Sequence, residues 1–179
     1  MTDYRRLLER LWGFHAAFET LLADAAAQGL LVSELAERRR SHWLEQDLAT
    51  LGVSRSGVEA LPQCRTLRRP GSAAELLGAL YVVEGSTMGG ALLARALAPL
   101  VGTSEDAARR FFVGYGAANG ARWRDFLTRL DRLSGDEAAE REAIEGARAA
   151  FADFEDWMSG AGAAASQPNA APEPLRVAG

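Results

Sequence analysis

Few side chains in this 179-residue sequence are of the types that carry chemistry, and their spacing argues against several common sites. There are two histidines, His15 and His42, and one cysteine, Cys64. The histidines form no HxxxH, HExxH or paired ExxH motif, so we do not expect a metal site built wholly from protein ligands. A single cysteine excludes an intramolecular disulfide and a cysteine-rich zinc site, and it fits a reducing cytoplasm.

The strongest chemical signal is a glycine-rich segment. Residues 85–90 read GSTMGG and lie within the mostly apolar run of residues 76–100, LLGALYVVEGSTMGGALLARALAPL. This is not the GxSxG of a serine hydrolase, and GxGxxG is absent, so neither a nucleophile elbow nor a dinucleotide site is indicated. Each glycine inside a helix costs about 1 kcal/mol relative to alanine. We therefore predict a buried helix that kinks at these glycines and lies against something flat or bulky.

Apolar residues at three- and four-residue steps predict the helices that must position these groups. Their expected ranges are residues 3–28, 33–51, 73–101, 104–113, 120–133 and 137–158. Asp3, Ser33, Ser72 and Asp136 are suitable N-caps, and Glu75 completes a capping box with Ser72. Residues 52–71 are rich in glycine and proline and predict a long connection.

No segment alternates between apolar and polar residues for long enough to predict a strand. The expected fold is therefore all-α, a single-domain helical bundle of about six helices. We expect residues 1–158 to form this domain and residues 159–179, rich in Gly, Ala and Pro, to form a disordered tail.

Charge and hydropathy argue against nucleic-acid and membrane partners. The net charge of −4 provides no overall positive field for either. Gly85 and Gly89 have the GxxxG spacing of packed membrane helices, but Glu84 and Arg95 would each cost about 2.5–3.5 kcal/mol at a bilayer centre. The N-terminus lacks the features of a signal peptide. We therefore expect a cytoplasmic protein.

Two segments together resemble the bacterial heme oxygenase family, especially the type that supplies biliverdin to bacteriophytochromes. They are residues 81–97, YVVEGSTMGGALLARAL, and residues 109–130, RRFFVGYGAANGARWRDFLTRL. The similarity extends upstream through YRRLLERLWGFHAAFE, DLATLG and LPQCRTL, and it covers most of residues 4–158. EGSTxGG followed by FFxGYGxxxxxRW is more specific than either half alone.

The resemblance implies that the glycine-rich segment is the distal helix, whose backbone lies on the face of the heme. Gly85, Gly89 and Gly90 then leave space for the ligand because they lack a Cβ atom. Ser86 stands where animal relatives have an aspartate that organises distal water, and its hydroxyl can still hydrogen-bond water.

Three further residues are candidates for contacts with the heme propionates. The resemblance places Arg122 and Arg124 where guanidinium groups could pair with these carboxylates, and the alternative is a solvated helix face. Tyr115, like Tyr4, could supply an oxygen ligand or a propionate contact, although ordinary packing accounts for either tyrosine equally well.

The sequence departs from the family pattern at the proximal side of the heme. Family members carry the iron-ligating histidine on a first helix, whereas this sequence starts at what resembles the second family helix. His15, in GFHAAFE, is either a substitute axial ligand or a packed histidine on an apolar stripe. His42 follows three arginines and is expected at the surface. A misplaced start codon would also explain the difference, and the preceding genomic sequence would test it.

The resemblance implies a heme oxygenase, which binds heme and cleaves it to biliverdin, carbon monoxide and ferrous iron. Heme would be both substrate and redox group, a reductase would supply electrons, and a bacteriophytochrome would be a further partner. The alternative is a non-catalytic relative that binds a tetrapyrrole or a protein partner, including a second copy of itself.

Overall fold

Helices account for the regular structure of the residues that the structure describes. The computed structural model describes residues 1–30, 38–102 and 107–160, and no strand occurs within these ranges. The helices are α1 (Thr2–Ala27), α3 (Ser41–Thr50), α4 (Arg55–Glu59), α5 (Ala73–Val101), α6 (Arg110–Val113), α7 (Asn119–Leu130) and α8 (Glu137–Ser159). Short 3-10 turns, Gly116–Ala118 and Asp131–Leu133, precede and follow α7. The predicted all-α fold is confirmed.

Several predicted helix ends are confirmed by their hydrogen bonds. The Ser72 hydroxyl accepts from the backbone N–H of Glu75 at 3.2 Å and begins α5. Asp136 accepts from the N–H groups of Ala138 and Ala139, both at 3.1 Å, and begins α8. Gly102 ends α5 with a φ of 90°, which favours glycine.

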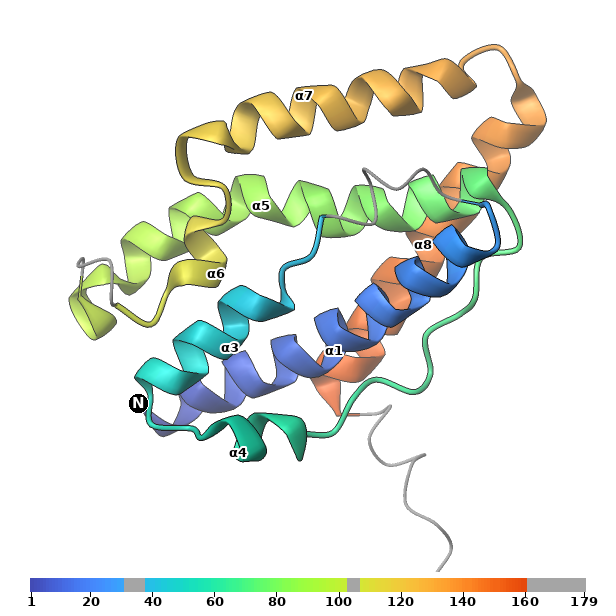
Figure 1. The fold of residues 1–179 in the computed structure, drawn as a ribbon. Coiled ribbons are helices and arrows are strands. Elements are labelled where there is room, and N and C mark those ends of the chain that lie inside the picture. Colours follow the sequence, from blue (N-terminus) through green and yellow to red (C-terminus); the bar gives the residue numbers. More distant parts are fainter. Residues whose placement is uncertain (31–37, 103–106, 161–179) are drawn as a thin grey trace, which may run out of the picture.

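The central contact of the fold is the crossing of α5 and α8. A Cβ atom on Gly78 would lie 1.8 Å from the carbonyl oxygen of Ala143, and one on Gly146 would lie 1.9 Å from that of Glu75. The two backbones can approach this closely only because both positions are glycine. Figure 1 shows α1 beside α8, α3 beside α1, and α7 along the other side of α5.

Two clusters of buried apolar side chains hold these helices together. The first joins α1, α5 and α8, and it includes Phe14, Phe18, Leu76, Leu80 and Trp157. The second joins α1, α3 and α6, and it includes Leu8, Trp12, Leu44, Leu48 and Phe112. Both clusters use α1, which explains why this helix is apolar over a broad stripe.

A buried carboxylate fixes the short helix α6. Asp47, on α3, accepts hydrogen bonds from the backbone N–H groups of Arg110 at 2.7 Å and Phe111 at 2.9 Å. Burial raises the pKa of Asp47 to about 6, although these two hydrogen bonds oppose the rise. The Tyr4 hydroxyl donates to the carbonyl oxygen of Ala108 just before α6.

The structure corrects four details of the predicted elements. Helix α3 begins at Ser41, and residues 38–40 are not helical; the rest of the predicted start, residues 31–37, lies outside the described residues. The long connection contains α4. Only Arg110–Val113 of the predicted helix 104–113 is helical among its described residues. Asp3 is in the first turn of α1 rather than at its N-cap.

The glycine-rich segment does not interrupt α5. This helix runs from Ala73 to Val101 as a single element, so the predicted kink does not appear as a break in its secondary structure (Figure 1). It is also the one described helix that is long and apolar enough to cross a membrane, a property that core helices of soluble proteins share. The predicted tail falls almost entirely on residues 161–179, which lie outside the described residues.

The glycine crossing predicts a large effect of a single methyl group. Gly146→Ala should lower the free energy of unfolding by about 2–3 kcal/mol, because the Cβ atom would force the two backbones apart. The matched control is Gly89→Ala on α5, where the Cβ atom has open space. That control should raise stability by up to about 1 kcal/mol through helix propensity. Urea unfolding of both variants measures the difference, and equal stabilities would contradict the close crossing.

Asp47 predicts a specific dependence of stability on pH. Its pKa is higher in the folded protein than its ordinary value of 3.8, so folding favours the protonated form. The corresponding stabilisation is present below about pH 4 and is lost as the pH rises to about 6. Relative to Asp47→Asn, the wild-type protein should therefore lose about 3 kcal/mol of stability across this range. Unfolding curves of both proteins at several pH values measure this, and a pH-independent difference would contradict it.

Candidate functional site

A cavity of about 530 Å³ lies among α1, α5, α6, α7 and α8. Its volume is within the range typical of sites for small molecules and cofactors. Most of its lining is apolar or aromatic, and it comprises Leu11, Phe14, His15, Arg40, Tyr81, Val82, Val83, Gly85, Ser86, Met88, Gly90, Leu93, Phe111, Phe112, Trp123, Phe151 and Phe154. The cavity therefore suits a largely apolar ligand.

The glycines of α5 have different structural requirements. A Cβ atom on Gly90 would lie 2.8 Å from the carbonyl oxygen of Phe112, so the packing of α6 demands glycine there. A Cβ atom on Gly85 would make an ordinary contact with Trp123, at 3.4 Å. Around a Cβ atom on Gly89, no described neighbour lies within 4 Å. Packing within the described chain thus explains Gly90 but not Gly85 or Gly89.

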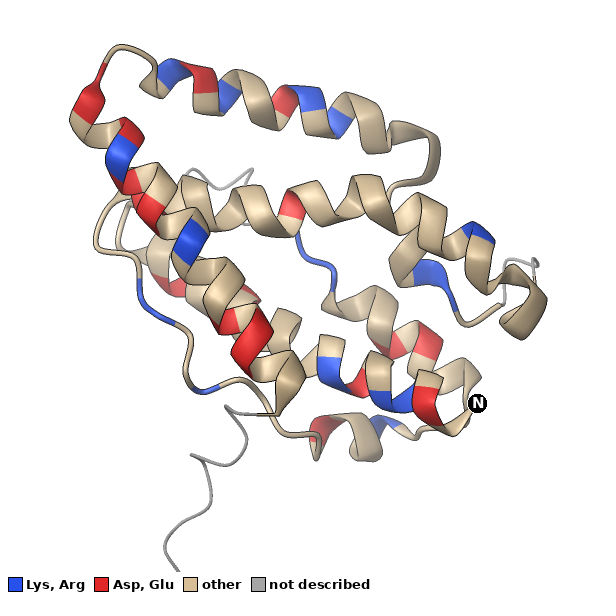
Figure 2. Cartoon of the chain, turned by 180° about the vertical axis from the view of Figure 1, so that it is seen from behind, with Lys and Arg blue, Asp and Glu red and all other residues tan. Residues whose placement is uncertain are grey.

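The cavity continues into exposed apolar surface. Tyr81, Met88 and Leu93 of α5 and Phe151 of α8 line the cavity and are also exposed, Phe151 by 56% of its surface. Figure 2 shows that α5 carries few charged residues along its length. Clustered, exposed apolar side chains are typical of a site that a ligand or partner covers.

Of the two histidines in the sequence, His15 lines the cavity and His42 does not. His15 is 4% exposed, and its ring packs edge-on against Phe111 with 4.9 Å between centroids. Burial, and then the nearby charge of Arg40, lower the pKa of His15 well below its ordinary value, so the imidazole is neutral at pH 7. No hydrogen bond to this imidazole occurs among the described residues. His42 instead lies against Trp43.

Arg40 was not anticipated as a site residue. Its side chain is 2% exposed, donates to the carbonyl oxygen of Val83 at 2.5 Å and to the Ser86 hydroxyl at 3.0 Å, and lies over the ring of Phe111. Its Nε atom is buried without a hydrogen-bond partner among the described residues. Arg40, Ser86 and His15 are the polar side chains at the edge of this apolar cavity, apart from the tyrosine and tryptophan rings.

The predicted distal residues are largely brought together. Gly85, Ser86 and Gly90 line the cavity, and Gly89 lies between two lining residues, Met88 and Gly90. The Ser86 hydroxyl donates to the carbonyl oxygen of Val83 at 2.7 Å while it accepts from Arg40. Ser86 therefore holds Arg40 in place and keeps little hydrogen-bonding capacity for another molecule.

The residues proposed for propionate contacts lie away from the lining. Arg122 stacks over the ring of Tyr115 at 4.3 Å, and Tyr115 packs edge-on against Trp43 at 5.0 Å. Arg124 is exposed on α7. Between the two arginines, Trp123 is the α7 residue that lines the cavity. No group of three or more histidine, cysteine, aspartate or glutamate side chains able to hold a metal ion occurs in the described parts of the chain.

This sequence is similar to known proteins over most of its length. The family model described as heme oxygenase matches residues 1–160. A heme oxygenase of Xanthomonas campestris pv. campestris (strain 8004) is 33% identical over 156 residues, which cover 87% of this chain and 88% of that relative. Heme oxygenase PigA of Pseudomonas aeruginosa is 32% identical over 158 residues, or 87% of this chain and 76% of the relative. On this evidence the chain belongs to the heme oxygenase family.

Proposed function

We propose that this protein is a heme oxygenase that binds heme in the cavity beside α5 and cleaves it to biliverdin, carbon monoxide and ferrous iron. Family membership supports the reaction class. The observation that carries the proposed site is the pair Gly85 and Gly89, which packing within the described chain does not explain. Both glycines are next to an apolar cavity. A flat ligand that approaches the helix backbone there would explain why the chain has glycine at these positions, although glycine lowers the stability of a helix.

The lining supports heme as the ligand because its chemistry matches that of a large, flat, mostly apolar molecule. The aromatic side chains Phe14, Phe111, Trp123 and Phe154 offer extensive apolar contact. The exposed rim formed by Tyr81, Met88, Leu93 and Phe151 would be covered in part by the bound substrate. We expect the reaction in the cytoplasm, with electrons from a reductase, and biliverdin passed to a bacteriophytochrome.

The polar side chains define what the protein contributes to the reaction. Hydrogen bonds to Val83 and Ser86 fix the orientation of the Arg40 guanidinium, and therefore also the directions of its remaining N–H groups. We propose that Arg40 donates to water or to the polar part of the substrate, and that Ser86 keeps Arg40 in the position to do so. Heme supplies the redox chemistry, while these residues orient and hydrogen-bond.

His15 is also our candidate for the axial ligand of the heme iron. A neutral imidazole is a suitable iron ligand, and His15 is the histidine on the cavity lining. Its lowered pKa keeps it unprotonated, as ligation requires. Arg122, Arg124 and Tyr115 remain proposed propionate contacts. For Arg122 and Tyr115, such a contact would compete with their stacking on each other.

Addition of hemin to the purified protein tests the binding site. The wild-type protein should bind one equivalent with a shifted Soret band. Gly89→Phe should weaken binding by about 10- to 100-fold, because the ring would occupy space that the ligand needs. The control is Ala96→Phe, which places the same ring on an exposed position of α5 outside the cavity lining. Equal affinities of the two variants would contradict the proposed seat of the heme.

His15→Ala tests ligation and catalysis separately. If His15 ligates the iron, the variant should lose the Soret band of an imidazole complex, and added imidazole should restore it. An unchanged spectrum would show that the ligand comes from elsewhere. Reductant and oxygen should then convert hemin bound to the wild-type protein into biliverdin. Bound hemin that persists under these conditions would favour the alternative, a tetrapyrrole-binding relative without the reaction.

A further inference from the structure

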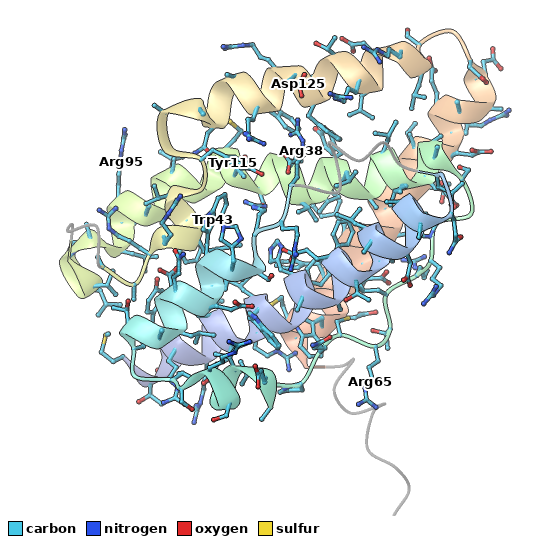
Figure 3. The ribbon with its side chains drawn as sticks, in the orientation of Figure 1. Arg38, Trp43, Arg65, Arg95, Tyr115 and Asp125 are labelled. Carbon is cyan, nitrogen blue, oxygen red and sulfur yellow. The ribbon has the colours of Figure 1, made fainter. Side chains whose placement is uncertain are left out.

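A buried arginine joins three separate parts of the chain. Arg38, just before α3, is 5% exposed, and its Nη1 atom lies 2.5 Å from an oxygen of Glu84 on α5. Its Nη2 atom lies 2.6 Å from an oxygen of Asp125 on α7. Figure 3 shows Arg38 between α5 and α7, with Asp125 on the facing side of α7. Charge-assisted hydrogen bonds from one planar guanidinium thus connect the two helices.

These contacts occur beside the cavity. Glu84 immediately precedes Gly85, and Asp125 follows Trp123 by two residues. Both Gly85 and Trp123 line the cavity, and a Cβ atom on Gly85 would lie 3.4 Å from the ring of Trp123. Arg38 therefore connects the helix that carries the glycine to the helix that carries the ring facing it.

Helix α7 packs mainly against α5. Among the described helices its main neighbour is α5, and Figure 1 shows it on the side of α5 away from α1 and α3. The turns at its ends contain Gly114, Gly116 and Gly135, all with positive φ. Phe126 of α7 is buried, and the guanidinium of Arg38 lies over its ring at 5.8 Å, so the apolar contact of α7 is centred on the same place as the ionic one.

The two carboxylates depend on Arg38 to different extents. Glu84 is 1% exposed, and its second oxygen, Oε1, has no hydrogen-bond partner among the described residues, so loss of Arg38 would leave a buried carboxylate without its ion-pair partner. Asp125 is 54% exposed, and its removal leaves Arg38 paired with Glu84, so no buried charge loses its only ion-pair partner. Asp125 is therefore the better position at which to test the link between the helices.

We propose that Arg38 is a positioning residue that holds α7 against α5, so that Trp123 closes the cavity over Gly85. The part of this proposal that concerns heme rests on the proposed function. The consequence is that Arg38, which does not line the cavity, controls how long a flat ligand stays bound.

Hydrogen exchange of the ligand-free protein tests the link without reference to heme. Asp125→Ala should make the amides of α7 exchange roughly tenfold faster, while those of α1 and α8 stay unchanged. The matched control is Asp24→Ala, which removes a carboxylate on α1 that is 44% exposed and paired with Arg69 at 3.3 Å, away from the cavity. Unchanged exchange in α7 of Asp125→Ala would overturn the proposal, whether or not the protein binds hemin.

A second variant separates Arg38 from the other neighbour of Asp125. Asp125 also lies 3.5 Å from Arg129 within α7. Arg38→Lys leaves that pair intact and keeps a positive charge near Glu84, but a single ammonium group cannot bridge both carboxylates as the guanidinium does. It should reproduce the faster exchange of α7. If it does not, the effect of Asp125→Ala belongs to Arg129 and the proposal fails.

The dissociation rate of bound hemin tests the positioning role, and excess apomyoglobin captures the released hemin. Dissociation should be roughly tenfold faster from Asp125→Ala and Arg38→Lys, unchanged in Asp24→Ala, and close to wild type in the conservative variant Asp125→Glu. Faster exchange in α7 with unchanged dissociation would overturn control of the ligand. If the wild-type protein binds no hemin but α7 still exchanges faster in Asp125→Ala and Arg38→Lys, the link between the helices is supported and the proposed function is contradicted.

Discussion

The close crossing of α5 and α8 determines the rest of the architecture. Gly78 and Gly146 place each helix against a backbone carbonyl group of the other, which a side chain at either position would prevent. The two helices meet in their first halves and run apart toward their C-terminal ends (Figure 1). Side chains of α1, α6 and α7 enclose the space that opens there, and this space is the cavity.

The glycines of this chain serve two physical purposes, which their neighbours distinguish. At Gly78, Gly90 and Gly146 a backbone atom of this protein occupies the place of a side chain. At Gly89 the corresponding place is empty of described atoms. A glycine of the first kind stabilises the fold, whereas one of the second kind weakens its helix and is useful only when something outside the chain approaches.

The fold was predictable from the sequence because amphipathic periodicity and N-caps are local signals. Ser72 and Asp136 begin helices as their neighbours predict. Contacts between distant segments have no such signal. Arg38 and Arg40 stand in a run of three arginines that resembles a solvated surface, yet the side chains of both are buried and donate to groups at least 43 residues away. Likewise, the proximity of His15 to Arg40 depends on how α1 meets the segment before α3, which no local pattern encodes.

The buried charge of Arg40 has an electrical consequence for whatever occupies the cavity. A cation in surroundings of low dielectric constant produces a positive potential that little water screens, and the buried carboxylate of Glu84 offsets part of it. Such a potential lowers the energy of an added electron and disfavours added positive charge. The charge of Arg40 would therefore raise the reduction potential of a redox-active occupant relative to the same site with a neutral side chain at this position.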